Sequence, residues 1–493
     1  MNYIKKVMLL SVLMIPFYVF AQEKPNVVLI YVDDLGYGDV SCYGATRIHT
    51  PNVDKLAEQG IVFTNGHCTS ATCTPSRYAL MTGEYPWRQK GHNILPGDAP
   101  LIIPTTKMTL PKVFKEAGYA TGIVGKWHLG LGDKTDKDWN GDISPSPNEV
   151  GFDYSFIFPA TADRVPTVFM ENHRVVGLES DDSIFVSYKH KVGDEPTGKD
   201  HPELLKLKSS VGHDQTIING IGRIGYMTGG RKTRWTDEEL SSTFLSKAEH
   251  FIEQNKQKPF FLYYALNDIH VPRMPATMFK GKSELGYRGD AILEMDWIVG
   301  EVVKQLNTLG LTRKTIIIFS SDNGPVLDDG YADDAVAKNG SHKPAGPYRG
   351  WKTTVYEGGT RVPFIVAWPG NLKAGVSDAM INQIDLAASF AKMLHVPIKE
   401  NELPDSENIL DVLLGKTKKG RNNMVEEGYN NLAIVSDNWK YIEPFGKNGA
   451  QLLDLNTDIG ETTNLADKYP EKLKALSDSL QIIKGKIVVA TAH

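Results

Sequence analysis

A short run of β-branched and aromatic residues that ends in two aspartates most constrains the fold. Residues 25–32 (PNVVLIYV) predict a strand buried on both faces, and Asp33 and Asp34 follow at its carboxyl end. Strands that alternate with helices predict a mostly parallel sheet with helices on both faces. Further strand patterns lie at 121–124, 260–265 and 315–319, and helical patterns at 112–117, 238–254 and 290–309.

Polar residues follow two of these strands. Asp33 and Asp34 follow the first, and Asp322 and Asn323 follow the run at 315–319. Ligand sites in open α/β sheets gather at the carboxyl ends of strands. All four side chains are oxygen donors, which favour Ca²⁺ first and Mg²⁺ second. An isolated aspartate at a strand end is more often a turn or cap residue, but two such pairs predict a calcium site.

The last part of the chain differs from the rest in its amino-acid composition and pattern. Residues 416–424 (KTKKGRNNM) form a polar, basic linker, and strand patterns at 433–444 and 451–455 precede an amphipathic helix at 469–484. These patterns predict a small antiparallel sheet with one helix. We therefore expect a main domain at 22–415 and an α+β subdomain at 416–493. The long segment 142–230 is rich in Gly, Pro, Asp and His, and we expect it to cover the main sheet irregularly.

The first residues have the pattern of an export signal. Lys5 and Lys6 precede an apolar run at 7–20, and Val19 and Ala21 suit the positions before a cleavage point. The run is shorter than the ~20 residues of a membrane span. We expect a signal peptide at 1–21, export to the periplasm or the medium, and no stable membrane anchor.

The net charge and the cysteine content further limit which kinds of protein the chain can be. The formal net charge is −5 and no basic stripe occurs, which argues against nucleic-acid binding. The chain has 3 cysteines, an odd number for an exported protein. Cys42 and Cys68 are candidates for a disulfide or for small buried residues, and the sequence leaves this open.

Cys73 lies in the most informative motif of the chain. This motif is Cys-Thr-Pro-Ser-Arg at 73–77, and Leu-Met-Thr-Gly follows at 80–83. Proline in a first turn is typical of a helix start, and helix N-termini favour anionic ligands. The motif resembles the C-x-P-x-R signature of the formylglycine-dependent sulfatases. In that family a maturase oxidises the cysteine to Cα-formylglycine. One hydroxyl of the hydrated aldehyde attacks sulfur, and the other expels sulfate as the aldehyde re-forms.

Other blocks of the chain resemble the same family in the same order. The resemblance implies an alkaline-phosphatase-like α/β sandwich with a small C-terminal subdomain. It also implies a metal shell that an oxygen of modified Cys73 and an oxygen of the substrate sulfate complete. The blocks are 26–44 (NVVLIYVDDLGYGDVSCYG), 125–130 (GKWHLG), 321–324 (SDNG) and 350–363 (GWKTTVYEGGTRVP).

The resemblance also implies catalytic roles. Arg77 and Lys126 would orient and activate the nucleophile, and His128 would be the base of the eliminating step. Lys352 would hold a sulfate oxygen, and His270 is the candidate general acid. Taken singly, an exposed lysine is usually solvated and a lone histidine is usually structural. We also expect the glycines of 357–361 (EGGTR) to permit a tight turn.

Candidate substrate contacts lie in the irregular segment. Asp163, Arg164 and His213 are candidates for binding sugar hydroxyls, or for forming surface ion pairs of little energetic value. Family resemblance favours a sulfated glycan, and resemblance in the loop at 159–172 implies galactose or N-acetylgalactosamine as the sugar. Three tryptophans could stack on sugar rings but are more often core residues: Trp127, Trp235 and Trp351.

Two alternatives share the expected fold. A phosphatase or phosphodiesterase would use Ser or Thr and commonly two zinc ions with additional His and Asp ligands. This chain has Lys126 and Lys352 where a second metal would lie. A glycan-binding relative without activity is the other alternative, and the intact set of catalytic candidates argues against it.

Overall fold

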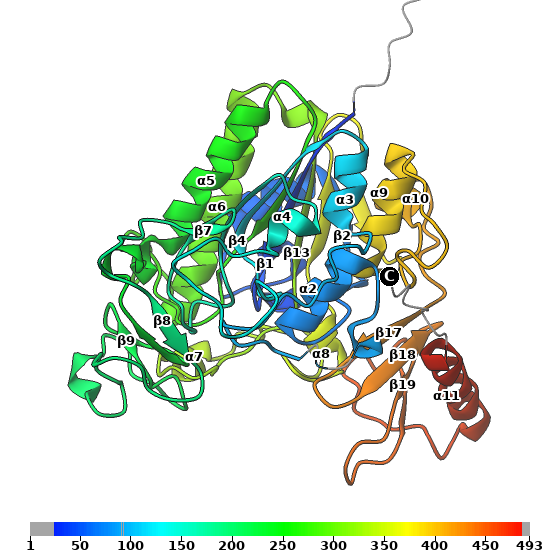
Figure 1. Cartoon of the computed structure of the whole chain (residues 1–493). Helices are drawn as coiled ribbons and strands as arrows, with labels where there is room; N and C mark the ends of the chain where they lie inside the picture. The colour runs from blue at the N-terminus through cyan, green and yellow to red at the C-terminus, as the bar shows by residue number, and fades with distance from the viewer. Residues whose placement is uncertain (1–23, 90, 92, 486–493) are drawn as a thin grey trace, which may run out of the picture.

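A ten-stranded sheet forms the centre of the protein in the computed structural model, which describes residues 24–89, 91 and 93–485 (Figure 1). The strand order is β15-β2-β14-β13-β1-β12-β4-β5-β6-β7. Five central strands run parallel: β13 (Thr315–Ser321), β1 (Asn26–Val32), β12 (Phe260–Ala265), β4 (Ala120–Lys126) and β5 (Tyr154–Phe158). The expected mostly parallel sheet is therefore confirmed.

Antiparallel pairs close both edges of the sheet. At one edge β14 (Phe364–Ala367) pairs antiparallel with β13 and with β2 (Gly60–Phe63), and β15 (Gly375–Ser377) is parallel to β2. At the other edge β6 (Met170–Glu171) pairs antiparallel with β5 and with β7 (Arg174–Val175). These short edge strands were not predicted.

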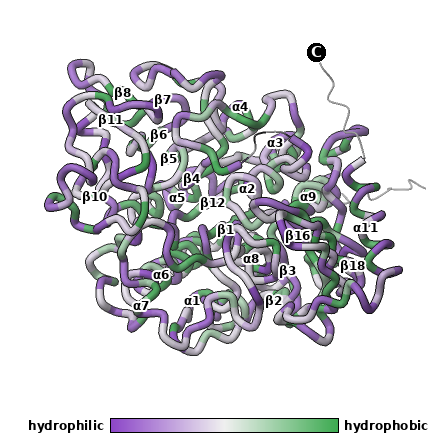
Figure 2. The backbone as a smooth tube through the Cα atoms, turned by 90° about the horizontal axis from the view of Figure 1, so that it is seen from below, coloured by the Kyte–Doolittle hydropathy of each residue, from purple (hydrophilic) through white to green (hydrophobic). Residues whose placement is uncertain are grey.

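Alternate residues of the central strands build two separate cores. Val28 and Ile30 face the helices α1 (Pro51–Glu58), α5 (Leu240–Asn255) and α6 (Gly286–Thr308). Val27 and Leu29 face α2 (Cys73–Thr82), α3 (Leu110–Glu116) and α9 (Leu386–Leu394). Burial on both faces explains why the β1 sequence is continuously apolar. Apolar segments accordingly run through the middle of the molecule in Figure 2.

A second sheet follows the linker. β17 (Asn423–Glu427), β18 (Leu432–Ser436), β19 (Trp439–Ile442) and β20 (Gln451–Asp454) form an antiparallel meander, and α11 (Pro470–Gly485) packs on it. Its apolar face joins a cluster that includes Ala79 of α2 and Tyr85. The C-terminal sheet thus packs against the helix that begins at Cys73.

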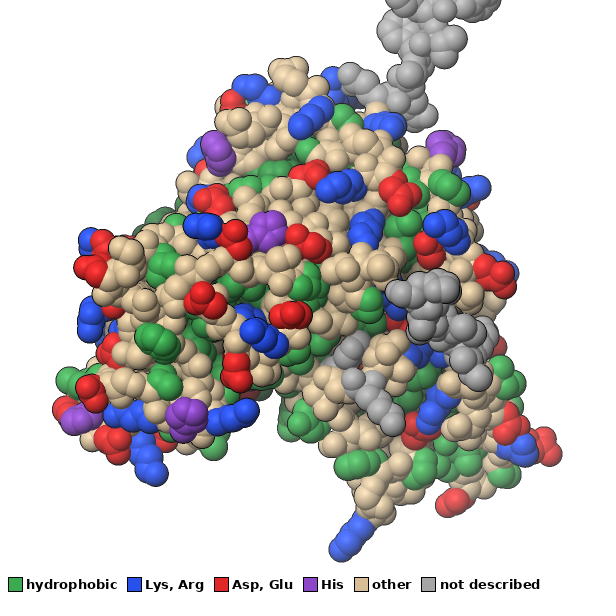
Figure 3. All heavy atoms as spheres, in the orientation of Figure 1, with side chains coloured by type: hydrophobic (Ala, Val, Ile, Leu, Met, Phe, Trp, Pro, Cys, Tyr) green, Lys and Arg blue, Asp and Glu red, His purple; other side chains and the backbone are tan. Residues whose placement is uncertain are grey.

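The segment 142–230 covers the sheet with short elements. After α4 (Pro147–Val150) and the strands β5–β7, it holds the two-stranded pairs β8 (Phe185–Ser187) with β11 (Tyr226–Thr228) and β9 (Ile217–Ile218) with β10 (Ile221–Gly222). Figure 3 shows the lower edge of the molecule hollowed between the lobe of β8 and β9 and the C-terminal sheet. The same face mixes acidic and basic side chains without a single-sign stripe.

The remaining short elements connect these layers. They are β3 (Gly66–His67), β16 (Ile381–Asn382), α7 (Ala335–Asn339), α8 (Glu357–Thr360), α10 (Leu410–Leu413) and single 3₁₀ turns at 37–39, 41–43, 86–88, 202–204, 231–233, 237–239, 312–314 and 383–385. No helix in the described residues has the length and apolarity to span a bilayer. The expected signal peptide at 1–21 lies outside the described residues.

Two sequence expectations are resolved here. Cys42 and Cys68 are free thiols, and Cys68 is buried, so they do not form a disulfide. The glycines of block 357–361 lie in the short helix α8, a single tight turn in which the N–H of Gly359 donates to the carbonyl of Tyr356 at 2.8 Å, as expected. A Cβ at Gly359 would lie 2.0 Å from the carbonyl oxygen of Thr354, so close backbone packing requires glycine there.

Candidate active site

Two pairs of polar side chains meet at the carboxyl ends of β1 and β13. The strands pair in parallel along their whole length, so the residues that follow them are neighbours. Asp33, Asp34, Asp322 and Asn323 are all fully buried. The Asn323 amide donates to the Asp34 carboxylate at 2.7 Å, and the backbone N–H of Asp34 donates to Asp322 at 3.2 Å.

The chemistry of this cluster fits a hard cation. Oδ1 of Asp33 and Oδ1 of Asn323 are buried and have no hydrogen-bond partner among the described residues. Burial and the neighbouring Asp322 raise the pKa of Asp33 well above its usual value. Ligand atoms of Asp33, Asp34 and His270 lie within 4.8 Å of one another. A divalent cation bound here would satisfy the unpaired oxygens and offset the repulsion between the carboxylates.

Cys73 is the first residue of α2, and every residue of this helix is buried. Burial raises the pKa of the Cys73 thiol, although Lys126 and Lys352 oppose the shift. A protonated thiol is a weak nucleophile. The thiol therefore lies in the right place for a nucleophile but in surroundings that do not activate it.

Arg77 extends from the next turn of α2 into the carboxylate cluster. Its guanidinium donates to Asp322 at 2.9 Å from Nη2 and at 3.1 Å from Nε, and to the hydroxyl of Tyr263 at 3.2 Å. The two bonds to Asp322 hold its carboxylate in place at the end of β13.

Lys126 and His128 come from the end of β4. The ammonium of Lys126 lies 2.5 Å from Asp33 and 4.0 Å from Asp322. His128 Nε2 donates to the carbonyl of Leu95 at 2.9 Å, and its buried Nδ1 has no partner in the described part of the chain. Burial and Lys126 hold the pKa of His128 well below its usual value. The imidazole is therefore neutral, with Nδ1 able to accept a proton.

Lys352 and His270 flank the same carboxylates from the other side. The Lys352 ammonium lies 2.8 Å from Asp34 and 2.7 Å from Asp329. Against the effect of burial, Asp329 and Asp34 raise the pKa of Lys352. His270 Nε2 lies 3.8 Å from Asp34 and 3.7 Å from Asp329, and its Nδ1 donates to Val271. Burial and Lys352 lower the pKa of His270 well below its usual value.

A cavity of about 310 Å³ opens over these groups. Cys73, His270 and Lys352 line it together with Asp163, Arg164 and His213. The Asp163 carboxylate accepts hydrogen bonds from Arg164 and from His213, each at 2.9 Å. Although burial opposes it, Arg164 and His213 lower the pKa of Asp163 well below its usual value. The structure thus brings the three predicted substrate contacts to the cavity that holds the catalytic candidates.

Two residues that line this cavity were not predicted from the sequence. Asp329 and Thr353 both line it, and Asp329 contacts Lys352 and His270. No motif marks Asp329, which lies in a loop beyond the metal block. Of the three tryptophans, Trp127 and Trp235 are core residues, whereas Trp351 is 62% exposed and lines the cavity.

Comparison with known proteins identifies the family. Residues 25–396 match the sulfatase family model, and residues 349–484 match the model described as N-sulphoglucosamine sulphohydrolase, C-terminal. The chain belongs to the sulfatase family. It is a sulfuric ester hydrolase, as the motif at Cys73 predicted.

Curated sulfatases match nearly the whole chain. An N-acetylgalactosamine-6-O-sulfatase of Bacteroides thetaiotaomicron is 52% identical over 479 residues, which are 94% of each chain. Human arylsulfatase A is 30% identical, and the match spans 94% of this chain and 89% of that protein.

Solved structures also match nearly the whole chain, at different degrees of similarity. One from work on glycosaminoglycan metabolism by Bacteroides thetaiotaomicron is 51% identical with a TM-score of 0.93, and the match covers 94% of this chain and 100% of that chain. A phosphonate monoester hydrolase of Agrobacterium radiobacter has a TM-score of 0.59 at 15% identity, covering 94% of this chain and 96% of that chain. The last match shows the shared fold alone.

Proposed function

We propose that this sulfatase removes the 6-O-sulfate from N-acetylgalactosamine units of a sulfated glycan. The observation that carries the proposal is the 52% identity to the Bacteroides thetaiotaomicron N-acetylgalactosamine-6-O-sulfatase over 94% of the chain. The galactose-type preference inferred from the loop at 159–172 agrees with it. The phosphatase alternative would need a second metal where two lysines lie.

The nucleophile derives from Cys73. A maturase would oxidise the side chain to formylglycine, and its hydrate supplies a hydroxyl for attack on sulfur and a second hydroxyl for release of sulfate. The raised pKa of the buried thiol makes unmodified Cys73 a poor alternative. Mass spectrometry of the Cys73 peptide should show loss of sulfur and gain of oxygen, with activity proportional to the converted fraction. Full activity with only the thiol present would contradict this assignment.

Calcium is the proposed cation, held by Asp33, Asp34, Asp322 and Asn323 together with an oxygen of modified Cys73. When bound, it supplies positive charge to the nucleophile and to the sulfate oxygens. The chain's own cations add to this effect. Lys352 would hold a sulfate oxygen, Lys126 would bind the nucleophile's oxygen, and Arg77 would keep Asp322 in place.

Two neutral histidines would move the protons. Nδ1 of His128 is oriented to accept a proton by the bond from Nε2 to the Leu95 carbonyl. We assign it as the base of the eliminating step. His270 would donate a proton to the departing alcohol, and the negative charge of a bound sulfate ester would stabilise its protonated form.

Asp163, Arg164 and His213 would bind the hydroxyls of the sulfated sugar. The hydrogen bonds within this group hold the Asp163 carboxylate as an acceptor at the cavity wall. Its depressed pKa keeps it ionised at neutral pH. Residues 1–21 would direct export to the periplasm or the medium, where polymeric glycans are accessible.

Sulfate release from a panel of monosulfated sugars tests the proposal. The panel compares N-acetylgalactosamine 6-sulfate with its 4-sulfate, with galactose 6-sulfate, with N-acetylglucosamine 6-sulfate and with N-acetylgalactosamine 6-phosphate. The first should have the highest kcat/KM, and the phosphate should be a poor substrate. A higher value for another sugar or position would overturn the assigned substrate, and efficient phosphate release would restore the phosphatase alternative.

A further inference from the structure

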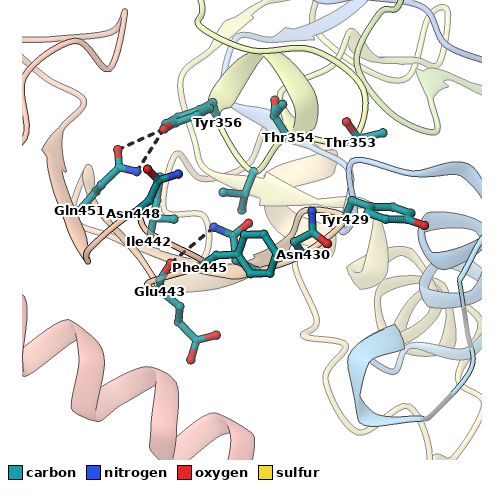
Figure 4. A pocket seen from close by; sticks show the side chains of 12 residues that line it. Thr353, Thr354, Tyr356, Tyr429, Asn430, Ile442, Glu443, Phe445, Asn448 and Gln451 are labelled. Atoms are coloured by element: carbon teal, nitrogen blue, oxygen red, sulfur yellow. Dashed lines mark hydrogen bonds between the residues drawn. The ribbon is translucent and has the colours of Figure 1, made fainter. Parts of the chain in front are cut away.

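A second cavity of about 340 Å³ adjoins the one that contains Cys73 (Figure 4). Thr353, the residue after Lys352, lines both cavities. One wall of the second cavity is the segment 353–356, and the other wall is formed by residues 429–431 and 442–451 of the C-terminal sheet and its loops. A ligand that leaves the active site past Thr353 therefore enters a space between the segment 353–356 and the C-terminal sheet.

The junction between the cavities is held in a defined conformation. Thr353 has a φ of 78°, which is unfavourable for a β-branched residue. Its backbone N–H donates to the Ala71 carbonyl at 2.7 Å, and its carbonyl accepts from the N–H of Tyr429 at 2.8 Å. Residues held in such strained conformations cluster at ligand-binding sites. The bond from Tyr429 joins the active-site segment to the turn between β17 and β18 of the C-terminal sheet.

The lining has the chemistry of a carbohydrate site. Tyr429 and Phe445 are 57% and 47% exposed, and their rings border the cavity. Exposed aromatic rings can pack on the apolar face of a sugar. Asn430 and Asn448 contribute side-chain amides that hydrogen-bond to no other described residue, and amides suit hydroxyl groups. Cavities of about 300–1,000 Å³ with apolar walls and a few polar groups are typical ligand sites.

This lining lacks positive charge, unlike the active site. No Lys or Arg occurs among the described residues that border the cavity. Its one acidic residue, Glu443, is paired with Lys484 of α11 at 2.7 Å, and Figure 4 shows its carboxylate directed away from the cavity. Arg349 stacks on the Tyr356 ring, but its guanidinium donates to the carbonyl of Glu461. An anionic sugar would find no counter-ion here.

We infer that this cavity binds the uncharged sugar unit, a hexose or N-acetylhexosamine, that neighbours the sulfated sugar in the glycan. The inference rests on the proposed function and adds the chemical class of the second sugar. Phe445 and Tyr429 supply the stacking surface, and Asn430 and Asn448 bind hydroxyls. A hexuronate neighbour is disfavoured because its carboxylate would lose hydration without gaining a cation.

Kinetics on three probes test the inference. They are 6-sulfated N-acetylgalactosamine alone, linked to N-acetylglucosamine, and linked to glucuronate at the same position. The wild type should have the highest kcat/KM on the neutral disaccharide. Phe445→Ala should reduce the ratio of neutral-disaccharide to monosaccharide kcat/KM by about 3- to 10-fold, the range of one aromatic contact. Phe185→Ala, at a residue 59% exposed on β8, is the matched control and should leave the ratio unchanged.

A second variant, at another residue of the same wall, tests the charge argument. Asn430→Lys adds a cation and should raise kcat/KM on the glucuronate disaccharide relative to the neutral one. An unchanged ratio in Phe445→Ala, or a wild-type preference for the glucuronate disaccharide, would overturn the assignment of this cavity while leaving sulfate release intact. If the wild type released sulfate from none of the three probes, the proposed function would fail and this inference with it.

Discussion

Residues that follow strands could be assigned to the site from the sequence, whereas Asp329, on a loop that carries no motif, could not. Asp33 and Asp322 were assigned to one site because ligand sites gather at the carboxyl ends of strands, and the parallel pairing of β1 with β13 makes them neighbours. Asp329 lies 2.7 Å from the Lys352 ammonium, but its position depends on the path of a loop. That path is set by the fit of Gly330 against His213, because a Cβ at Gly330 would lie 2.0 Å from the imidazole ring. Such long-range fit has no local sequence pattern.

The first prediction concerns the cation. Added Ca²⁺ should raise the melting temperature of the wild type, because a ligand that binds only the folded state stabilises it by about 2.7 kcal/mol at 100 times its Kd. Asp322→Ala should lose most of this shift and nearly all turnover. Asp467→Ala, at an exposed aspartate of the C-terminal region, is the control and should retain both. A wild type that keeps its rate after exhaustive chelation, or that binds zinc in place of calcium, would contradict the assignment.

The second prediction concerns His270 as general acid. A sugar alcohol needs a proton as the S–O bond breaks, whereas nitrophenolate leaves without one. His270→Ala should therefore lower kcat on a sugar sulfate by about 10²–10⁴-fold and lower kcat on nitrophenyl sulfate much less. Both kcat and kcat/KM should be compared, on a wild type that cleaves both substrates. Equal losses would indicate sulfate binding by His270 and would move the acid role to Lys352.

At the scale of elements, the strands and helices that could be predicted were those with a long apolar run or a regular helical periodicity. The strands at 260–265 and 315–319 were predicted because they are apolar on both faces, and their helices because of their periodicity. The edge strands β6 and β7 have 2 residues each, too few to show any alternation. The contact of α8 with the C-terminal sheet could not be predicted from the sequence either, because it depends on buried charged residues from distant parts of the chain.

The third prediction tests that contact. Lys440 of β19 lies 2.9 Å from Glu357 of α8 and 2.8 Å from Glu426 of β17, and all three residues are buried. Despite burial, Lys440 and His67 lower the pKa of Glu426 to about 2. A carboxyl with a lowered folded-state pKa stabilises the fold above its unfolded pKa of about 4.3, and this stability is lost as pH falls toward 2.

Glu426→Gln should therefore lower the melting temperature at pH 7 and make it less dependent on pH between about 4.5 and 2. Loss of one partner from a buried ion pair costs about 3–5 kcal/mol. Asp478→Asn breaks an exposed pair with Lys474 on α11 and should change the melting temperature little. Equal effects of the two substitutions at pH 7 would show that the buried cluster does not stabilise the contact.

At the scale of the whole molecule, helix α2 and the C-terminal sheet share one apolar cluster. Ala79 of α2, Val425 and Ile434 of the C-terminal sheet, and Leu476 and Leu480 of α11 belong to it. The boundary at residue 416, which was proposed from a change in composition, therefore separates two sheets but not two independent cores. Because α2 begins at Cys73, packing of the C-terminal sheet supports the helix that presents the nucleophile.

The fourth prediction follows from this shared cluster. Leu480 is fully buried, and Leu480→Ala should cost about 2–5 kcal/mol of folding free energy through the cavity it leaves. Since the cluster includes α2, calorimetry should show one unfolding transition at a lower temperature, and loss of activity on heating should follow the same curve. Ile482→Ala, at a residue 68% exposed on the same helix, should shift neither curve. An early transition that melts the C-terminal sheet while sulfate release continues would show that the two sheets are energetically independent and that α2 needs no support from β17–β20.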